Sequence, residues 1–331
     1  MNEMEAPLSD PRRRKSTTAC PLAEVPSRLG RVGRHGRAMN ANRTGDSFKH
    51  VRLVATDLDG TLLRSDGTVS IRSRNALAQL QAGGVELVFI TARPPRWMGP
   101  IAAMTGHDGI AICANGAITY DLRAERVVDS CPLSAEAALE VVRRLRHAVP
   151  GGTFAVETAE GFACEPGHLQ HQWDEESNPR VADVLQLLEW PALKLLFGHP
   201  RRTADSLLAV AQKAVGGLAE ATHSNPERSA IELSAPGISK ATTLARLCNG
   251  WGIDPSEVLA FGDMPNDLPM LTWAGTAFAV ANAHPRVLAA VTRFTASNDE
   301  DGVAKVLERL LAEREVAQTA NIAPRSINPL K

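Results

Sequence analysis

Apolar runs alternate with helical patterns over the first stretch of the chain that shows any periodicity. Strands are predicted at residues 51–55, 85–90 and 109–114, and helices over about 73–82 and 96–105. Short, nearly continuous apolar runs are typical of parallel strands that are covered on both faces. Because strands and helices alternate, the pattern predicts right-handed crossovers and a parallel sheet.

The same alternation of predicted strands and helices returns towards the C-terminal end. Ser239 suits the N-cap of a helix that runs to about Cys248, and a strand follows at residues 258–261. We expect these elements to belong to the same sheet as the first stretch. Further strands are predicted at residues 277–280 and 293–296, and a last helix over about 302–313.

Residues 133–235 have a different texture, in which strands and helices do not alternate strictly. Such a pattern is typical of an α+β unit with an antiparallel sheet. The predicted helices cover residues 135–148, 182–188 and 203–215. The predicted short strands lie near residues 153–158, 161–165, 194–197, 218–222 and 230–234.

These patterns predict an α/β protein of two domains with terminal extensions. Residues 49–132 and 236–315 would form a doubly wound, Rossmann-like parallel-sheet core, and residues 133–235 an inserted α+β domain. Residues 1–48 are rich in Arg, Pro, Ser and Gly, and we expect a disordered basic extension there. Residues 316–331 are polar and contain proline, which predicts a flexible tail.

Charge is unevenly distributed along the chain. The net charge is -1 over 331 residues, but residues 1–50 contain eight Arg and two Lys against five acids, which gives +5 there and -6 in the remainder. An acidic body argues against polyanion binding by the folded part and fits the use of a cationic metal. Aromatic residues make up only 4%, which disfavours a stacking surface for single-stranded nucleic acid.

The five cysteines are well separated and include no Cys-x-x-Cys pair, so we expect reduced, structural thiols. No apolar run reaches the length of a membrane span, and the N-terminus lacks the apolar core of a signal peptide. These features predict a cytoplasmic protein that does not enter a membrane. The oligomeric state is left open.

Asp57 and Asp59 stand where the first predicted strand ends, two residues apart. Ligands of open parallel sheets collect at the carboxyl ends of strands, so a charged pair is well placed there for chemistry. Two carboxylates this close repel unless a cation or a proton lies between them. The pair therefore indicates a divalent metal site or an acid beside a nucleophile, although Asp-Gly is also an ordinary turn signal.

Polar residues occupy further positions on the same predicted rim. Thr91 follows the second strand and Lys240 begins a helix. Asp263 follows a later strand, with Asn266 and Asp267 shortly after it. A carboxylate can attack phosphorus, and a metal ion neutralises the repulsion between the two anions. Since an ammonium group and a hydroxyl can hold the equatorial oxygens of the transition state, the set predicts phosphoryl transfer.

The order of these residues resembles the haloacid dehalogenase superfamily of aspartate-nucleophile phosphatases. Its four motifs match the Asp-x-Asp-Gly-Thr box from Asp57, then Thr91, then Lys240, and the Gly-Asp-x-x-Asn-Asp box from Gly262. The resemblance covers roughly residues 51–312 and implies that residues 133–235 are a large cap inserted between the second and third motifs. Further likeness to the Cof-type subfamily lies in Asn115-Gly116-Ala117, Ile231-Glu232-Leu233 and Glu300-Asp301-Gly302-Val303-Ala304.

The resemblance implies a role for each aspartate. Asp57 would be the nucleophile that forms an aspartyl-phosphate, and Asp59 the general acid for the leaving alcohol and the base for the attacking water. Mg²⁺ would be held by the Asp57 carboxylate, the Asp59 backbone carbonyl and Asp263. Asp267 would orient Lys240 or a metal-bound water.

The resemblance also implies a phosphate-binding set. Ala92 stands where the family often has Gly, which would narrow the pocket without removing the Thr91 hydroxyl. For Arg93 we leave open a contact with substrate and a surface ion pair. The phosphoryl group would be bound by Thr91, the backbone amides of Leu58 and Ala92, and the side chains of Lys240 and Asn266.

Together these features predict a Mg²⁺-dependent phosphatase that hydrolyses a small phosphorylated metabolite. A phosphosugar is the first expected substrate class, and a phosphorylated cofactor such as FMN or pyridoxal phosphate is the second. One alternative is a phosphomutase of the same superfamily, which returns the phosphoryl group to its substrate. Another is a non-catalytic sensor that binds a phosphorylated ligand.

Overall fold

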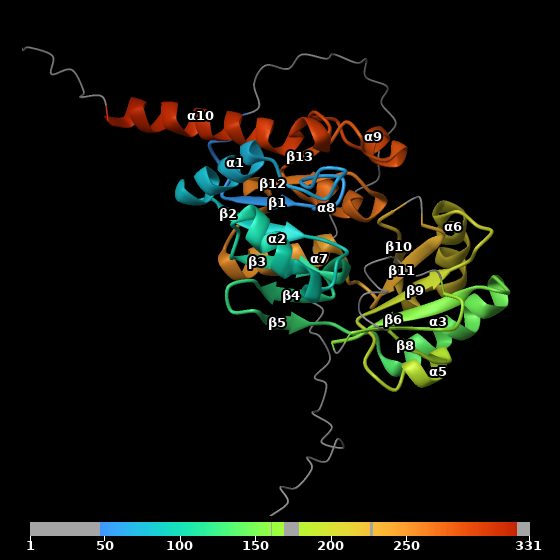
Figure 1. Cartoon of the computed structure of the whole chain (residues 1–331). Coiled ribbons are helices and arrows are strands. Elements are labelled where there is room, and N and C mark those ends of the chain that lie inside the picture. Colours follow the sequence, from blue (N-terminus) through green and yellow to red (C-terminus); the bar gives the residue numbers. More distant parts are fainter. Residues whose placement is uncertain (1–46, 160, 169–178, 226–227, 323–331) are drawn as a thin grey trace, which may run out of the picture.

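The strands of the protein form two separate sheets (Figure 1). Strands of the first sheet lie within residues 53–130 and 258–279, and strands of the second within residues 153–234. The second sheet is therefore built from chain that is inserted between the two parts of the first. The computed structural model describes residues 47–159, 161–168, 179–225 and 228–322.

The first sheet has the strand order β13-β12-β1-β2-β3-β4-β5. Neighbours from β13 to β3 are parallel, and β4 and β5 are added through antiparallel pairs. The sequence pattern does not predict the β4–β5 hairpin, because β5 is exposed along its whole length and has no buried face. The strands are β1 (Leu53–Thr56), β2 (Glu86–Ile90), β3 (Ile110–Cys113), β4 (Ile118–Asp121), β5 (Arg126–Ser130), β12 (Val258–Gly262) and β13 (Thr276–Ala279).

Helices cover both faces of the parallel strands (Figure 1). Val54 of β1 belongs to the buried cluster of one face, whereas its neighbour Leu53 belongs to that of the other. This arrangement confirms the predicted doubly wound α/β core. One face carries α1 (Ile71–Ala82), α2 (Met98–Thr105) and α10 (Gly302–Ile322); the other carries α7 (Lys240–Trp251), α8 (Leu268–Trp273) and α9 (Pro285–Ala290).

The second sheet has the order β10-β11-β9-β6-β7-β8, and its pairs are antiparallel except for β7 with β8. Helices α3 (Ala135–Ala148) and α6 (Ala204–Val215) pack against each other (Figure 1). A short helix α5 (Val184–Leu187) lies near β6 and β7. The strands are β6 (Thr153–Glu157), β7 (Phe162–Cys164), β8 (Arg180–Val181), β9 (Lys194–Gly198), β10 (Glu220–Thr222) and β11 (Ala230–Ser234).

Three sequence expectations are wrong at the edges of the fold. The strand expected at residues 293–296 is a single bridge between Phe294 and Ala279, because Phe294 is 51% exposed and no burial stabilises a longer pairing. Phe48 is buried, so the folded part begins before residue 49. The helix α10 continues to Ile322 because good helix formers follow Glu313 without Gly or Pro, so the tail does not begin at residue 316.

Cys113, Cys164 and Cys248 are buried free thiols, as expected. Cys131 is disulfide-bonded, so the expectation of reduced thiols is wrong at that position, since spacing along the chain does not show which thiols meet. Among the helices of the described residues, none has the length and apolar character needed to span a bilayer.

Candidate active site

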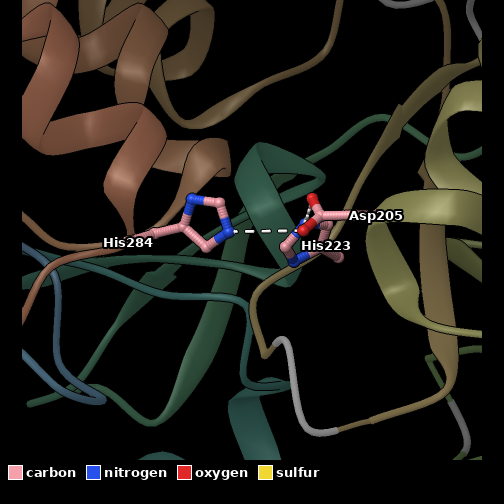
Figure 2. Close-up of side chains that lie close together, drawn as sticks. All are labelled: Asp205, His223 and His284. Carbon is pink, nitrogen blue, oxygen red and sulfur yellow. Dashed lines mark hydrogen bonds and ion pairs between the residues drawn. The ribbon is translucent and has the colours of Figure 1, made fainter.

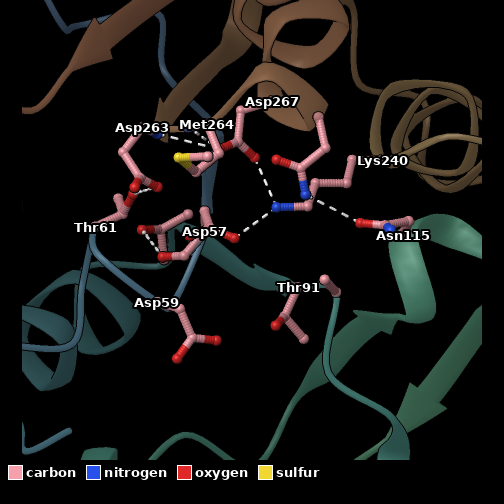
Figure 3. Close-up of polar contacts among 12 residues, drawn as sticks. Asp57, Asp59, Thr61, Thr91, Asn115, Lys240, Asp263, Met264 and Asp267 are labelled. Atoms are coloured by element: carbon pink, nitrogen blue, oxygen red, sulfur yellow. Dashed lines mark hydrogen bonds and ion pairs between the residues drawn. The ribbon is translucent and has the colours of Figure 1, made fainter. Parts of the chain in front are cut away.

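The predicted site residues converge at the carboxyl ends of the parallel strands. Asp57, Thr91 and Asp263 follow β1, β2 and β12, which are neighbours in the sheet. Lys240, the first residue of α7, points towards them (Figure 3). These four residues are buried. A cavity of about 660 Å³ opens above them, and the predicted residues among its lining are Asp57, Asp59, Ala92, Lys240, Asp263 and Asn266.

The ammonium group of Lys240 joins two of the carboxylates (Figure 3). Its Nζ lies 2.5 Å from Asp57 Oδ1 and 2.7 Å from Asp267 Oδ1. The other oxygen of Asp267 accepts hydrogen bonds from the backbone amides of Asp263 and Met264, at 3.1 and 2.9 Å. Asp267 therefore holds both the lysine and the loop that carries Asp263.

Three buried carboxylates share this single ammonium group. The carboxylate oxygens of Asp57, Asp263 and Asp267 lie within 4.8 Å of one another. Burial raises the pKa of Asp57 to about 7, although Lys240 opposes this, and the charges of Asp267 and Asp59 add to the rise. Burial and the charge of Asp57 also raise the pKa of Asp263 well above its ordinary value. The ionised carboxylates are therefore only partly neutralised by Lys240.

A divalent cation fits this arrangement. The donors are all oxygens, which are the ligands that Mg²⁺ prefers. One carboxylate oxygen of Asp263 accepts a hydrogen bond from the Thr61 hydroxyl at 2.8 Å, which leaves the second oxygen to bind a cation. Within the described residues, Asn266 Oδ1 is buried and has no hydrogen-bond partner. This oxygen could accept a hydrogen bond from a water molecule that coordinates the cation.

Two local features bring these groups so close. Gly60 has a φ of +77°, and a Cβ there would lie 2.5 Å from Asp263 Oδ2, so only glycine permits this approach. Ser239 caps α7 by accepting a hydrogen bond from the Thr242 amide, and the Thr242 hydroxyl accepts one from Ser239 in return. This capping box sets where Lys240 begins the helix.

Asp59 lies apart from the Lys240 cluster. Its two oxygens accept hydrogen bonds from Arg93 Nε and a terminal guanidinium nitrogen, at 2.8 and 2.6 Å, and its side chain is 52% exposed. Thr91 contributes to the same corner, because its hydroxyl accepts a hydrogen bond from the Arg93 amide at 3.0 Å. Arg93 therefore forms an ion pair within the site.

The second sheet supplies lining residues that were not among the predicted site residues. Lys194 and Glu232 face the cavity from β9 and β11, and their side chains form an ion pair at 2.7 Å. Lys194 also donates to the Ala92 carbonyl at 2.9 Å. The sequence signal for both residues is a charged side chain in an otherwise apolar strand: Lys194 begins Lys-Leu-Leu-Phe-Gly, and Glu232 lies inside Ala-Ile-Glu-Leu-Ser.

A second polar cluster joins α6 to the start of α9 (Figure 2). Asp205 lies 3.0 Å from His223 Nε2 and 3.5 Å from His284 Nε2. The Arg286 amide donates to His284 Nδ1, so a neutral His284 carries its hydrogen on Nε2 and donates to Asp205. A metal ligand needs the opposite tautomer, so the geometry fits a hydrogen-bonded bridge between the two sheets' regions.

Comparison with known proteins agrees with this geometry. Among curated proteins, the chain is 28% identical over 268 residues to pyridoxal phosphate phosphatase YbhA of Escherichia coli, which covers 77% of this chain and 97% of that protein. It is 27% identical over 273 residues to 5-amino-6-(5-phospho-D-ribitylamino)uracil phosphatase YbjI of the same species, which covers 79% and 96%. A solved haloacid dehalogenase-like hydrolase from Bacillus subtilis has a TM-score of 0.67 at 26% identity and covers 78% of this chain and 100% of its own.

The family model of haloacid dehalogenase-like hydrolases matches residues 54–307. This range includes Asp57, Thr91, Lys240 and the loop from Asp263 to Asp267. The solved structure has a similar fold over 78% of this chain. The chain therefore belongs to the haloacid dehalogenase-like hydrolases, which confirms the predicted resemblance to that superfamily and to its Cof-type branch.

Proposed function

We propose that this chain is a Mg²⁺-dependent phosphatase that hydrolyses a small phosphorylated metabolite through an aspartyl-phosphate intermediate. The observation that carries the proposal is the buried Asp57 carboxylate, held by Lys240 beside Asp263 at the floor of the cavity. In this proposal residues 133–235 act as a cap over the cavity. Hydrolase relatives named for phosphate esters support the reaction class.

Mg²⁺ would be held by the carboxylates of Asp57 and Asp263 and by the backbone carbonyl of Asp59. When bound, the ion supplies positive charge that lets an anionic nucleophile approach an anionic phosphoryl group. The crowded carboxylates and the unpaired Asn266 Oδ1 support this assignment.

The residues of the chain would divide the reaction between them. Asp57 attacks phosphorus while the bond to the leaving oxygen breaks, and Asp59 gives that oxygen its proton. Asp59 then takes a proton from water, the water oxygen attacks phosphorus, and the bond to Asp57 breaks to release phosphate. Lys240 and Thr91 hold phosphoryl oxygens throughout. Since Arg93 occupies both oxygens of Asp59, this ion pair must open before proton transfer.

The cavity favours a substrate with an apolar or ring portion. Trp97, Phe162 and Leu196 line it beside the charged groups. We infer that these side chains pack against the ring of a phosphorylated cofactor while the charged groups hold its phosphate. The relative named for pyridoxal phosphate supports this inference. We therefore place a phosphorylated cofactor first, and a phosphosugar second.

The full chain should hydrolyse p-nitrophenyl phosphate only when Mg²⁺ is present. The substitution Asp57→Asn should lower turnover roughly 1,000-fold or more, because it removes the nucleophile of the covalent route. Asp108→Asn is the matched control, since Asp108 is exposed and pairs with Arg123 on the surface. Unchanged turnover in Asp57→Asn would sink the proposal.

Two alternatives are separated by the products. A phosphomutase would use the same two aspartates and would yield an isomer of the substrate in place of free phosphate. A sensor would bind phosphorylated compounds tightly without turnover across a broad panel. A cytoplasmic location, and the absence of nucleic acid and membrane partners for the folded body, stay predictions.

A further inference from the structure

Asn115 and Glu232 lie in two motifs to which the proposed chemistry gives no role. Both side chains are buried, at 3% and 7% exposure. Glu232, on β11, accepts a hydrogen bond from Asn115 Nδ2 at 2.7 Å through one oxygen and from Lys194 Nζ at 2.7 Å through the other. The carboxylate therefore links the second sheet to the loop that follows β3 in the first.

The charge on Glu232 determines which way two amides point. A carboxylate only accepts, so Asn115 must turn its Nδ2 towards Glu232 and its Oδ1 away. Asn115 Oδ1 then accepts from Asn266 Nδ2 at 3.0 Å (Figure 3). As a result, Asn266 Oδ1 and the second hydrogen of its Nδ2 remain for the cavity, which Asn266 lines.

The backbone around Asn115 keeps its side chain in place. Ala114 and Asn115 have φ values of +50° and +56°, in the left-handed region that non-glycine residues seldom adopt. The Asn115 amide donates to the Thr91 carbonyl at 3.1 Å. A Cβ at Gly116 would lie 2.3 Å from the Ser239 carbonyl oxygen. The loop is thus wedged between the end of β2 and the start of α7.

We propose that Glu232 is a positioning residue that orients the Asn266 amide through Asn115 while the second-sheet region rests on the rim of the first sheet. Lys194 contributes a second contact at the same rim, through the Ala92 carbonyl. This proposal rests on the proposed phosphatase function. It makes the orientation of an active-site amide depend on contact with the cap.

The substitution Glu232→Gln tests the polarity of this chain of hydrogen bonds, that is, which group donates and which accepts at each step from Glu232 to Asn266. The introduced glutamine has one accepting and one donating end, so it cannot accept from both Lys194 and Asn115. If its oxygen stays on Lys194, its nitrogen forces Asn115 and then Asn266 to flip. We expect kcat to fall roughly 10- to 100-fold, the size typical of outer partners of a metal site. Glu220→Gln is the control, since Glu220 is an exposed residue of β10 in the same sheet.

A second substitution should restore the original polarity. In the double variant Glu232→Gln with Asn115→Asp, the introduced aspartate has two accepting oxygens, one for the glutamine nitrogen and one for Asn266 Nδ2. We expect the double variant to recover most of the lost kcat. Asn115→Asp alone should be impaired, because two carboxylates then face each other. A wild-type kcat in Glu232→Gln, or losses that simply add in the double variant, would overturn the proposal.

The same four proteins, the wild type, the two single variants and the double variant, can also be compared without turnover. Titration calorimetry would measure how tightly each binds inorganic phosphate with Mg²⁺ present. Phosphate affinity should weaken in each single variant and recover in the double variant. If the wild-type chain hydrolyses nothing, the phosphatase proposal fails, while this binding cycle still decides the role of Glu232. Should Glu232→Gln fail to fold, the double variant must still bind phosphate more tightly than Asn115→Asp alone.

Discussion

At the scale of single residues, Lys240 supplies the positive charge that pairs with the buried carboxylates of Asp57 and Asp267. Burial alone would lower the pKa of Lys240, but the carboxylates of Asp267 and Asp57 raise it above the ordinary value, so the ammonium group stays charged. It neutralises only part of the negative charge around it. The remaining negative charge supports the proposal that the cluster binds a divalent cation.

Gly60 is important because it has no Cβ atom, which leaves room for the Asp263 carboxylate. Gly60→Ala should lower Mg²⁺-dependent turnover by at least about tenfold, because the added Cβ would press on Asp263 Oδ2 and alanine disfavours the left-handed backbone. Gly67→Ala is the control, since its φ is also positive, at +80°, but no atom lies within 4 Å of the added Cβ. Steady-state kinetics of both variants checks this. Equal losses would show that backbone strain alone, without contact at Asp263, accounts for the effect.

At the scale of elements, the active site depends on where strands end and helices begin. The strands β1, β2 and β12 are adjacent and parallel, so their terminal residues meet on one rim. Pro269 lies in the first turn of α8, where its missing amide costs little. The chain thus assembles the site from short local signals that meet only after the sheet forms.

The N-cap of α7 should matter for chemistry as well as stability. Ser239→Ala should cost about 1 kcal/mol of unfolding free energy, the usual value for loss of a cap, and should also lower kcat because Lys240 follows it directly. Ser134→Ala removes the corresponding cap of α3, far along the chain from the motifs. Urea unfolding should show similar losses for both variants, whereas only Ser239→Ala should affect kcat. A kcat loss of the same size in Ser134→Ala would contradict this.

At the scale of the whole molecule, the cavity lies where the regions of the two sheets meet. Contacts across this boundary include Lys194 with the Ala92 carbonyl, Glu232 with Asn115, and Asp205 with His284. The His284 amide also donates to the Asp263 carbonyl at 2.8 Å, so one of these bridges directly contacts the loop that carries Asp263. The closed arrangement of the molecule and the order of its active site are therefore connected.

The stability of the metal-free protein should fall as pH rises from about 4 to about 7. Asp57 has a raised pKa in the folded state, near 7 against 3.8 ordinarily, so the folded state holds a proton that the unfolded state releases. Mg²⁺ should raise the melting temperature more at pH 7.5 than at pH 5, because the ionised carboxylates can then bind it.

Melting curves in EDTA and in Mg²⁺ at both pH values check this expectation. Asp57→Asn is the control, since it removes one of the two titrating carboxylates and should weaken the pH dependence between pH 5 and 7.5. A melting temperature in EDTA that rises steadily over this range in the wild type would contradict the assignment.

Local signals were sufficient for the parallel core and for the motif residues. Apolar runs that end in Asp57, Thr91 and Asp263 carry enough information to predict the strands and the meeting of these residues at one end of the sheet. The hairpin β4–β5 could not be predicted from the apolar pattern, because β5 buries none of its residues. Glu232 and Asn115 stood inside recognised motifs, but their contact spans 117 positions along the chain.

The sequence by itself determined the order of strands and helices, the insertion, and the set of groups available for phosphoryl transfer, because these follow from periodicity and from residue types at strand ends. Only the tertiary structure decided which carboxylates share Lys240, that Asp59 pairs with Arg93, and that Glu232 reaches Asn115. The physical reason is that charge pairing and hydrogen-bond polarity depend on distances of a few ångströms between residues far apart in the chain, and no local pattern records those distances.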